Sequence, residues 1–351
     1  MKQILDWVRP AIKVVLNNQQ SVRNLEEETL PKVSMHLNEN PFGSPQNRYL
    51  SKSELPSRTI VGQLKGGVHP QCVSLANGTT DAIERLMRTF CTPMQDNVIV
   101  VEPTSGLYSH VAQVNDIEVR HVSLDAKFQL DVEAVMRTVG QFTKMVFLAS
   151  PNNPTGNLLS KESILQLCDQ FEGIVVVDEA FIEFSRSESL VKSISSYHNL
   201  VVVSSFSIAY ALASSRISAI LAHPLVIRAV EVLRHCFTLN AATLAAIESL
   251  PRRRFEVDKW VKSILEERSK LMLAVAQLPI SEKVYPTSSN FFLVRFKDGE
   301  DVYKYLSKHG IAVYNCSHIA GCENCLRITV SLPMDNNALV SALRLYCERV
   351  K

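Results

Sequence analysis

The sequence predicts an α/β fold, with a mainly parallel sheet covered by helices and a second, smaller domain. The chain has 351 residues, which is more than one ordinary hydrophobic core accommodates. Apolar runs alternate with amphipathic helical patterns along the chain, an order typical of parallel sheets. Each apolar run ends in polar or turn residues, at the strand end where open α/β sheets bind their ligands.

The elements follow in order along the chain. Expected strands of the large sheet lie within the segments 96–104, 144–156, 174–184 and 199–207. Helical patterns separate them, as at 160–171, and a long amphipathic helix is expected at 257–278. The smaller domain is expected to hold strands at 290–296, 311–315 and 326–332 and a closing helix at 336–350.

These elements suggest where the domains divide. We assign residues 35–270 to the large domain, and residues 1–34 together with 271–351 to the small one. The first residues are expected to form an arm or helix that packs on the small domain.

Composition excludes several classes of function. Hydrophobic residues make up 46% and charged residues 21%, which is typical of a globular protein. The net charge of +2 is too small to indicate a nucleic-acid or membrane partner. No apolar run approaches membrane-spanning length, and the first residues lack a signal-peptide pattern. The eight cysteines are scattered and indicate reduced thiols, so we expect a cytoplasmic protein.

Polar side chains at the strand ends suggest a cofactor site. Asp178 ends a strand of apolar residues, where its carboxylate needs a partner and could hold a protonated pyridine nitrogen. Gly78 and Thr79 precede a helical pattern, whose first N–H groups form an anion site. Ser207 and Arg216 would complete a phosphate cup. Each feature alone is more often structural, but the order and spacing of the set are specific.

From about residue 30 to its end, the chain resembles the fold-type I pyridoxal-phosphate aminotransferases, and specifically the histidinol-phosphate aminotransferases. The matching stretches are LNENPFGSPQNRY (37–49), LANGTTDAIE (75–84), SPNNPTGN (150–157), VVVDEAFIEF (175–184) and CLRITV (325–330). The resemblance implies an aspartate aminotransferase-like fold with a mainly parallel, seven-stranded-type sheet and a smaller α+β domain.

The resemblance also implies roles for single residues. Asn153 would contact the phenolic oxygen of the cofactor, and Asp178 would contact its ring nitrogen. The cofactor phosphate would be held by Gly78, Thr79, Ser205, Ser207 and Arg216. Tyr49 would reach the phosphate site of a partner subunit, which implies a homodimer. For the substrate, Arg327 would bind the carboxylate, and Asn38 would lie close to it.

One departure removes the central reactive group. The family's Schiff-base lysine falls on Ile208, and isoleucine has neither an amine to bond the cofactor nor a proton to transfer. Loss of the acid–base role alone costs about 10²–10⁴ in rate. No lysine lies between Lys192 and Lys259, so a shift of the alignment supplies no substitute.

Further departures affect other parts of the same site. Ser105 replaces the aromatic ring that stacks on the pyridine, which leaves a hollow unless Tyr108 fills it. Phe181 lacks the hydroxyl that bonds the phenolic oxygen, and Tyr314 replaces the arginine that binds the substrate phosphate. Serines also replace family glycines, at Ser214, Ser218 and Ser331.

These departures favour a catalytically impaired or inactive homologue that retains the fold, with pyridoxal phosphate bound non-covalently or not at all. A substitution made to trap an intermediate would explain Ile208 alone, whereas drift after loss of catalysis explains all the changes. One alternative is an active aminotransferase for histidinol phosphate and 2-oxoglutarate in histidine biosynthesis, or altered pyridoxal-phosphate chemistry. Another is a non-enzymatic partner of an active paralogue, as a heterodimer, or a protein that binds an amino acid or a phosphorylated ligand.

Four residues near the C-terminus are candidate metal ligands. Cys316, His318, Cys322 and Cys325 lie within ten residues, and they are the side-chain types that bind zinc. The family has a similar cysteine pair without needing metal. We therefore expect reduced thiols in a connecting loop and no metal.

Overall fold

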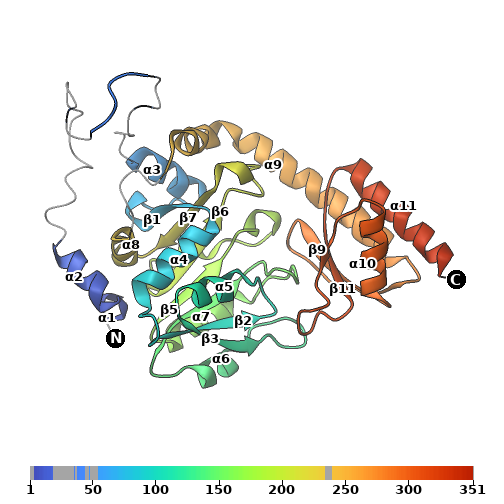
Figure 1. Cartoon of the computed structure of the whole chain (residues 1–351), viewed down its shortest axis with the longest axis horizontal. Helices are drawn as coiled ribbons and strands as arrows, with labels where there is room; N and C mark the ends of the chain where they lie inside the picture. Colours follow the sequence, from blue (N-terminus) through green and yellow to red (C-terminus); the bar gives the residue numbers. More distant parts are fainter. Residues whose placement is uncertain are drawn as a thin grey trace.

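The computed structural model describes residues 4–18, 35, 38–43, 47, 54–233 and 239–350. Its large sheet has seven strands in the order β1-β7-β6-β5-β4-β2-β3 (Figure 1). In that order the strands are Val73–Asn77, Ile217–Ala222, Leu200–Ser205, Ile174–Asp178, Thr143–Ala149, Asn97–Glu102 and Glu118–Ser123. The five strands from β6 to β3 are parallel, while β7 runs antiparallel to both of its neighbours.

Helices cover both faces of this sheet, which explains the continuous apolar strands. In β5, Val175 and Val177 face one core, while Ile174 and Val176 face the other. The first core is closed by helices α3 (Leu55–Leu64), α6 (Val132–Thr138), α7 (Lys161–Gln170) and the first part of α9 (Ala241–Ala276). The second is closed by α4 (Thr79–Phe90), α5 (Leu107–Val114) and α8 (Pro224–Glu231).

A second sheet of four antiparallel strands forms the smaller domain (Figure 1). Its order is β10 (Tyr314–Asn315), β11 (Cys325–Thr329), β9 (Phe291–Phe296) and β8 (Ser281–Val284), and it packs with α10 (Gly299–Lys308) and α11 (Pro333–Arg349). Helix α9 joins the two domains, because Leu244 and Val257 pack in the large core and Leu271 and Val275 in the small one.

The N-terminal helices differ from the sequence prediction. Ile4, Val8 and Ile12, from α1 (Ile4–Trp7), α2 (Pro10–Asn18) and the turn between them, are buried in the large-domain core beside α4 and α8. The N–H of Arg9 also donates to the carbonyl of Thr89 in α4, at 2.9 Å. The assignment of residues 1–34 to the small domain is therefore wrong for residues 4–18. The boundary at residue 270 stays a prediction.

The expected strands at the centre of the sheet are confirmed as β2, β4, β5 and β6. Helix α9 begins at Ala241, earlier than expected, and the strand expected at 311–315 is limited to Tyr314–Asn315. Four short 3₁₀ helices complete the described elements: η4 (Pro70–Cys72), η5 (Ile182–Phe184), η6 (Leu190–Ser193) and η7 (Ala213–Ser215). In the described ranges, no helix has both the length and the apolar character to cross a membrane.

Candidate functional site

The predicted cofactor residues converge at one edge of the large sheet. Asp178 and Ser205 end the neighbouring parallel strands β5 and β6. Because β7 is antiparallel, its start lies at this same edge, and Arg216 directly precedes it. Ser218 of β7 lies opposite Ser205, and Gly78 follows β1 on the other side of β7. The topology therefore gathers residues that are far apart in the sequence.

Gly78 and Arg216 form a cradle for an anion at the start of α4. Gly78 caps this twelve-residue helix with φ 87° and ψ 166°, a backbone conformation that is essentially restricted to glycine. A Cβ atom at this position would lie 2.4 Å from Nη2 of Arg216, so the guanidinium passes directly over the glycine. Beside it, the hydroxyls of Thr79 and Ser218 lie 3.2 Å apart. Helix N–H groups, hydroxyls and a guanidinium are the groups that bind phosphate.

Asp178 supplies a buried carboxylate near this cradle. Its Oδ1 accepts a hydrogen bond from the N–H of Ala180 at 2.9 Å, and its Oδ2 accepts one from the hydroxyl of Tyr108 at 3.0 Å. Burial raises the pKa of Asp178 to about 6, although both hydrogen bonds act in the opposite direction. Each oxygen retains a lone pair, so the carboxylate can accept a further N–H donor.

Tyr108 does not fill the hollow that Ser105 was expected to leave. Its ring is 1% exposed and stacks on Phe147 with a centroid distance of 5.5 Å, while its hydroxyl is held by Asp178. The sequence offered Tyr108 only as a replacement for the stacking ring, whereas its observed role is to orient Asp178. Tyr108 is the second residue of α5, and its hydroxyl meets Asp178 at the end of β5.

The two asparagines after β4 have different roles. Asn152 is buried, donates to the Pro103 carbonyl and the Thr155 hydroxyl, both at 2.7 Å, and so fixes the turn. Asn153 instead accepts a hydrogen bond on Oδ1 from Nη1 of Arg327, at 2.5 Å. This contact joins the large sheet to the small domain. It also brings together the predicted contacts for cofactor and substrate.

Arg327 is held between two aromatic rings. Tyr314 lies opposite Arg327 in the β10–β11 pairing, with its ring centroid 4.5 Å from Cζ. The ring of Phe291 on β9 is 5.2 Å away and meets Phe181 edge-on, with centroids 5.0 Å apart. Burial lowers the pKa of Arg327, and its Nε is buried with no hydrogen-bond partner among the described residues. Such a donor costs about 1–3 kcal/mol until it is satisfied.

Ile208 occupies the loop that follows β6. Its side chain is 39% exposed, and its carbonyl accepts the N–H of Ala211 at 3.0 Å. Just before it, the N–H of Ser207 donates to the Ser205 hydroxyl at 3.2 Å. The loop that carries this aliphatic side chain therefore begins at the strand end that holds Ser205.

A buried lysine lies behind this loop. Lys65 pairs with the carboxylate of Glu183 and lies over the rings of Phe206 and Tyr210, 4.8 and 4.9 Å from their centroids. Burial alone lowers the pKa of Lys65, but the nearby Glu183 carboxylate outweighs it and raises the pKa above its ordinary value. The amine is therefore held in its protonated, non-nucleophilic form.

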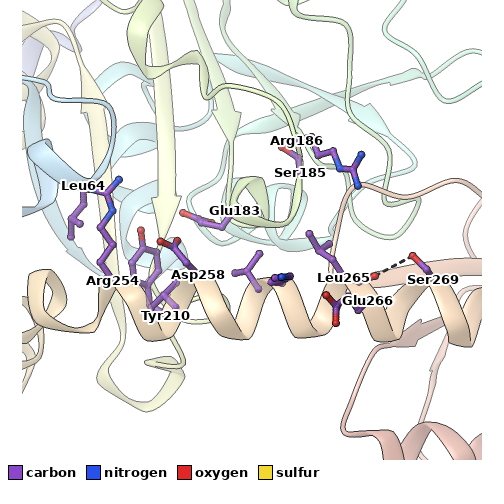
Figure 2. A pocket seen from close by; sticks show the side chains of 13 residues that line it. Leu64, Glu183, Ser185, Arg186, Tyr210, Arg254, Asp258, Leu265, Glu266 and Ser269 are labelled. Atoms are coloured by element: carbon purple, nitrogen blue, oxygen red, sulfur yellow. Dashed lines mark hydrogen bonds between the residues drawn. The ribbon is translucent and has the colours of Figure 1, made fainter.

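The cavity drawn in Figure 2 is separate from the sheet edge. It measures about 650 Å³ and lies between α9 and the loop after η5. Glu183 and Tyr210 face Arg254 and Asp258 of α9 across it. Its lining is mixed in charge and includes none of the predicted cofactor residues.

Two remaining predictions concern positions away from this cluster. Asn38 is exposed, with φ 54°, and its contact with substrate stays a prediction. Tyr49 lies outside the described residues.

The cysteine cluster is packed as thiols. Cys316, Cys322 and Cys325 are each 0% exposed and share an apolar cluster with Tyr285 and Leu293. Burial raises the pKa of Cys316 and of Cys322 to about 12. Within the part of the chain that the structure describes, no three metal-binding side chains are placed to hold one ion.

Comparison with known proteins gives a consistent result. Residues 65–343 match the family model described as aminotransferase class I and II. The chain is 36% identical over 346 residues to the histidinol-phosphate aminotransferase of Bacteroides thetaiotaomicron, covering 99% of both chains.

Solved structures match with a lower sequence identity. The histidinol-phosphate aminotransferase of Clostridium acetobutylicum has a TM-score of 0.74 at 22% identity, covering 84% of this chain and 90% of that one. The enzyme of Sinorhizobium meliloti, in complex with pyridoxal 5'-phosphate, has a TM-score of 0.79 at 17% identity, covering 98% of this chain and 88% of that one. These matches confirm the predicted fold-type I architecture.

Proposed function

The chain belongs to the class I and II aminotransferases, within the histidinol-phosphate aminotransferase family, and we propose that it is a member without aminotransferase activity. It would hold pyridoxal phosphate at the edge of the large sheet without a covalent bond. The observation that carries this proposal is Ile208, an exposed aliphatic residue that follows the sheet-edge residue Ser205 by three positions.

The residues of the site fit the non-covalent parts of the cofactor. The start of α4, with Gly78, Thr79 and Arg216, suits the phosphate, and a Cβ at position 78 would collide with the Arg216 guanidinium. The buried carboxylate of Asp178 suits a pyridine N–H. When bound in such a site, pyridoxal phosphate supplies an electron sink for carbanion chemistry.

The residue at the family's lysine position does not fit catalysis. Ile208 can neither bond a carbonyl carbon nor move a proton between two carbons. Lys65 does not replace it, because its amine is buried, protonated and paired with Glu183. A protonated amine has no lone pair with which to attack.

A second candidate is an active histidinol-phosphate aminotransferase. Its support is the 36% identity to a curated enzyme of that name over nearly the whole chain. This candidate requires an amine from another part of the chain. It also requires a site for the substrate phosphate at Tyr314, which carries no positive charge.

Membership of the family also suggests partners for this chain. A homodimer is proposed from the role of Tyr49, and pairing with an active paralogue would give a heterodimer that regulates it. A cytoplasmic location stays a prediction.

Activity can be tested in a histidine auxotroph that lacks its own aminotransferase. We expect no growth with the unaltered chain, and no glutamate formed from histidinol phosphate and 2-oxoglutarate by the purified protein. Ile208→Lys alone should not restore growth, because Ser105, Phe181 and Tyr314 still differ from the family. Growth with the unaltered chain would overturn the proposal in favour of the active enzyme.

A further inference from the structure

Asp81 lies in the first turn of α4, the helix that begins at the anion cradle. Its Oδ2 accepts a hydrogen bond at 2.8 Å from the N–H of Asn77, which ends β1 and directly precedes Gly78. The carboxylate therefore ties the end of β1 to the helix, across the glycine with the positive φ. Because the first N–H groups of a helix have no partner within it, the directions in which they point depend on this turn.

A carboxylate at position 81 has two opposite effects on anion binding. It competes with a bound phosphate for the positive end of the α4 dipole, and it repels that phosphate. Charge alone therefore predicts that an acid here weakens the cradle. The hydrogen bond to Asn77 acts in the opposite direction, because it holds the turn in one conformation before a ligand binds.

Arg85 is placed to offset the charge of Asp81. It lies one helical turn further along α4, is 5% exposed, and has its Nη2 3.3 Å from Oδ2 of Asp81. The same Nη2 donates to the Leu75 carbonyl at 2.7 Å, and Nη1 donates to the Ser74 hydroxyl at 3.3 Å. The guanidinium thus joins β1 to α4 and balances the carboxylate, which its several donors in one plane allow.

Arg85 is held in turn by a second buried ion pair. Glu231 of α8 is 6% exposed, has its Oε1 4.0 Å from Nη1 of Arg85, and accepts the hydroxyl of Ser74. The other oxygen of Glu231 pairs with Nη2 of Arg58 in α3, at 2.5 Å. Charges of alternating sign therefore run from α3 to the start of α4, and they fix the guanidinium beside Asp81.

We propose that Asp81 is a positioning residue of the phosphate cradle, which fixes the turn at Gly78 while Arg85 neutralises its charge. Asp81 acts through the N–H groups of the turn rather than by contact with the phosphate. The inference rests on the proposed function, because it concerns the part of that site that would hold the phosphate of pyridoxal phosphate. It adds two residues to which the family resemblance assigns no role.

Isothermal titration calorimetry of the full chain with two probes tests this role. Pyridoxamine 5'-phosphate and pyridoxamine differ only in the phosphate, and both lack the aldehyde that reacts with lysines. Asp81→Ala leaves the N–H of Asn77 without its acceptor, so the affinity for the phosphorylated probe should fall roughly 2- to 10-fold through loss of one hydrogen bond. The affinity for pyridoxamine should stay unchanged, whereas a merely structural role of Asp81 would weaken both probes.

Further variants separate position from charge. In Asp81→Asn the amide oxygen can still accept the N–H of Asn77 and the repulsion is gone, so the phosphorylated probe should bind at least as tightly as to the unaltered chain. Arg85→Met leaves the charge of Asp81 without its counterpart and should weaken that probe, and adding Asp81→Asn should restore affinity. Asp131→Ala is the matched control, because Asp131 also accepts a backbone N–H, that of Ala134 at 2.9 Å, but at the start of α6. It should lower the Tm and leave both affinities unchanged.

The unaltered chain distinguishes a failure of this inference from a failure of the proposed function. Thermal melting first verifies that each variant folds, and if Arg85→Met does not, the two Asp81 variants decide alone. If the unaltered chain binds the phosphorylated probe no more tightly than pyridoxamine, the cradle holds no phosphate, and the cofactor site and the role of Asp81 both fail. If it prefers the phosphorylated probe but Asp81→Ala binds it equally tightly, only the role of Asp81 fails. The same conclusion follows if Asp81→Asn binds this probe as weakly as Asp81→Ala.

Discussion

Gly78→Ala perturbs the anion cradle by adding a single methyl group. Alanine at φ 87° and ψ 166° occupies a region essentially restricted to glycine, at a cost of about 1–3 kcal/mol. For 351 residues, an unfolding entropy of about 2.1 cal/mol/K per residue turns this cost into a Tm decrease of about 1–4 °C. The new Cβ would also lie 2.4 Å from Nη2 and 2.9 Å from Cζ of Arg216.

The guanidinium is the end of a flexible side chain, so it can move away at little further cost in stability. Its displacement removes a charge-assisted contact from the phosphate. We therefore expect the affinity for pyridoxal phosphate to fall roughly 10- to 150-fold. Calorimetric titration measures the affinity, and differential scanning calorimetry measures the Tm.

Gly310→Ala provides the matched control in the small domain. Gly310 also has a positive φ, of 75°, but a Cβ there meets nothing within 4 Å. It should lower the Tm while leaving pyridoxal phosphate affinity unchanged. If Gly78→Ala binds as tightly as Gly310→Ala, the cradle does not hold the phosphate and the reasoning fails.

Three further predictions follow from titratable groups. Because the pKa of Asp178 is raised from 3.8 to about 6, the folded protein keeps this proton at pH 4–6 while the unfolded chain releases it. The contribution of Asp178 to the free energy of unfolding should therefore fall as the pH rises from 4 to 6. Urea unfolding of the unaltered chain and of Asp178→Asn over this range measures it, and an equal pH dependence of the unfolding free energy in the two proteins would contradict it. Lys65→Met leaves the partly buried Glu183 carboxylate without its partner, so urea unfolding should show a loss of about 1–3 kcal/mol. Lys65→Met combined with Glu183→Gln should lose less, and an equal loss would count against the ion pair. Elemental analysis should find substoichiometric zinc, because burial raises the pKa of Cys316 to about 12 and disfavours the thiolate; one zinc per chain would refute this.

The central strands could be predicted from the sequence because burial on both faces leaves a continuous apolar run, as in β5 and β6. Strand β3 escaped prediction because it is an edge strand that alternates charged and apolar residues, and only Val122 is buried in it. Pro251 lies inside α9 and interrupts the helical pattern there, so the sequence does not predict the start of this helix at Ala241. The apolar residues of α1 and α2 carry no information about which domain they pack on.

Single positions in the site were predictable, whereas contacts between them were not. Asp178 and Arg216 could be located from motif and spacing. The Tyr108–Asp178 hydrogen bond depends on how α5 packs against the large sheet. The position of Arg327 between Tyr314 and Phe291 depends on the register of three strands, which the sequence does not specify by itself.

The central claim is that this chain holds pyridoxal phosphate without a covalent bond. It is tested most directly by borohydride reduction of the protein mixed with pyridoxal phosphate, followed by gel filtration and peptide mass spectrometry. We predict that the cofactor separates from the unaltered chain and that no lysine carries a pyridoxyl group, whereas Ile208→Lys is modified at position 208. A pyridoxyl-lysine peptide from the unaltered chain would contradict the account, because it would identify an amine that takes the place of the missing one.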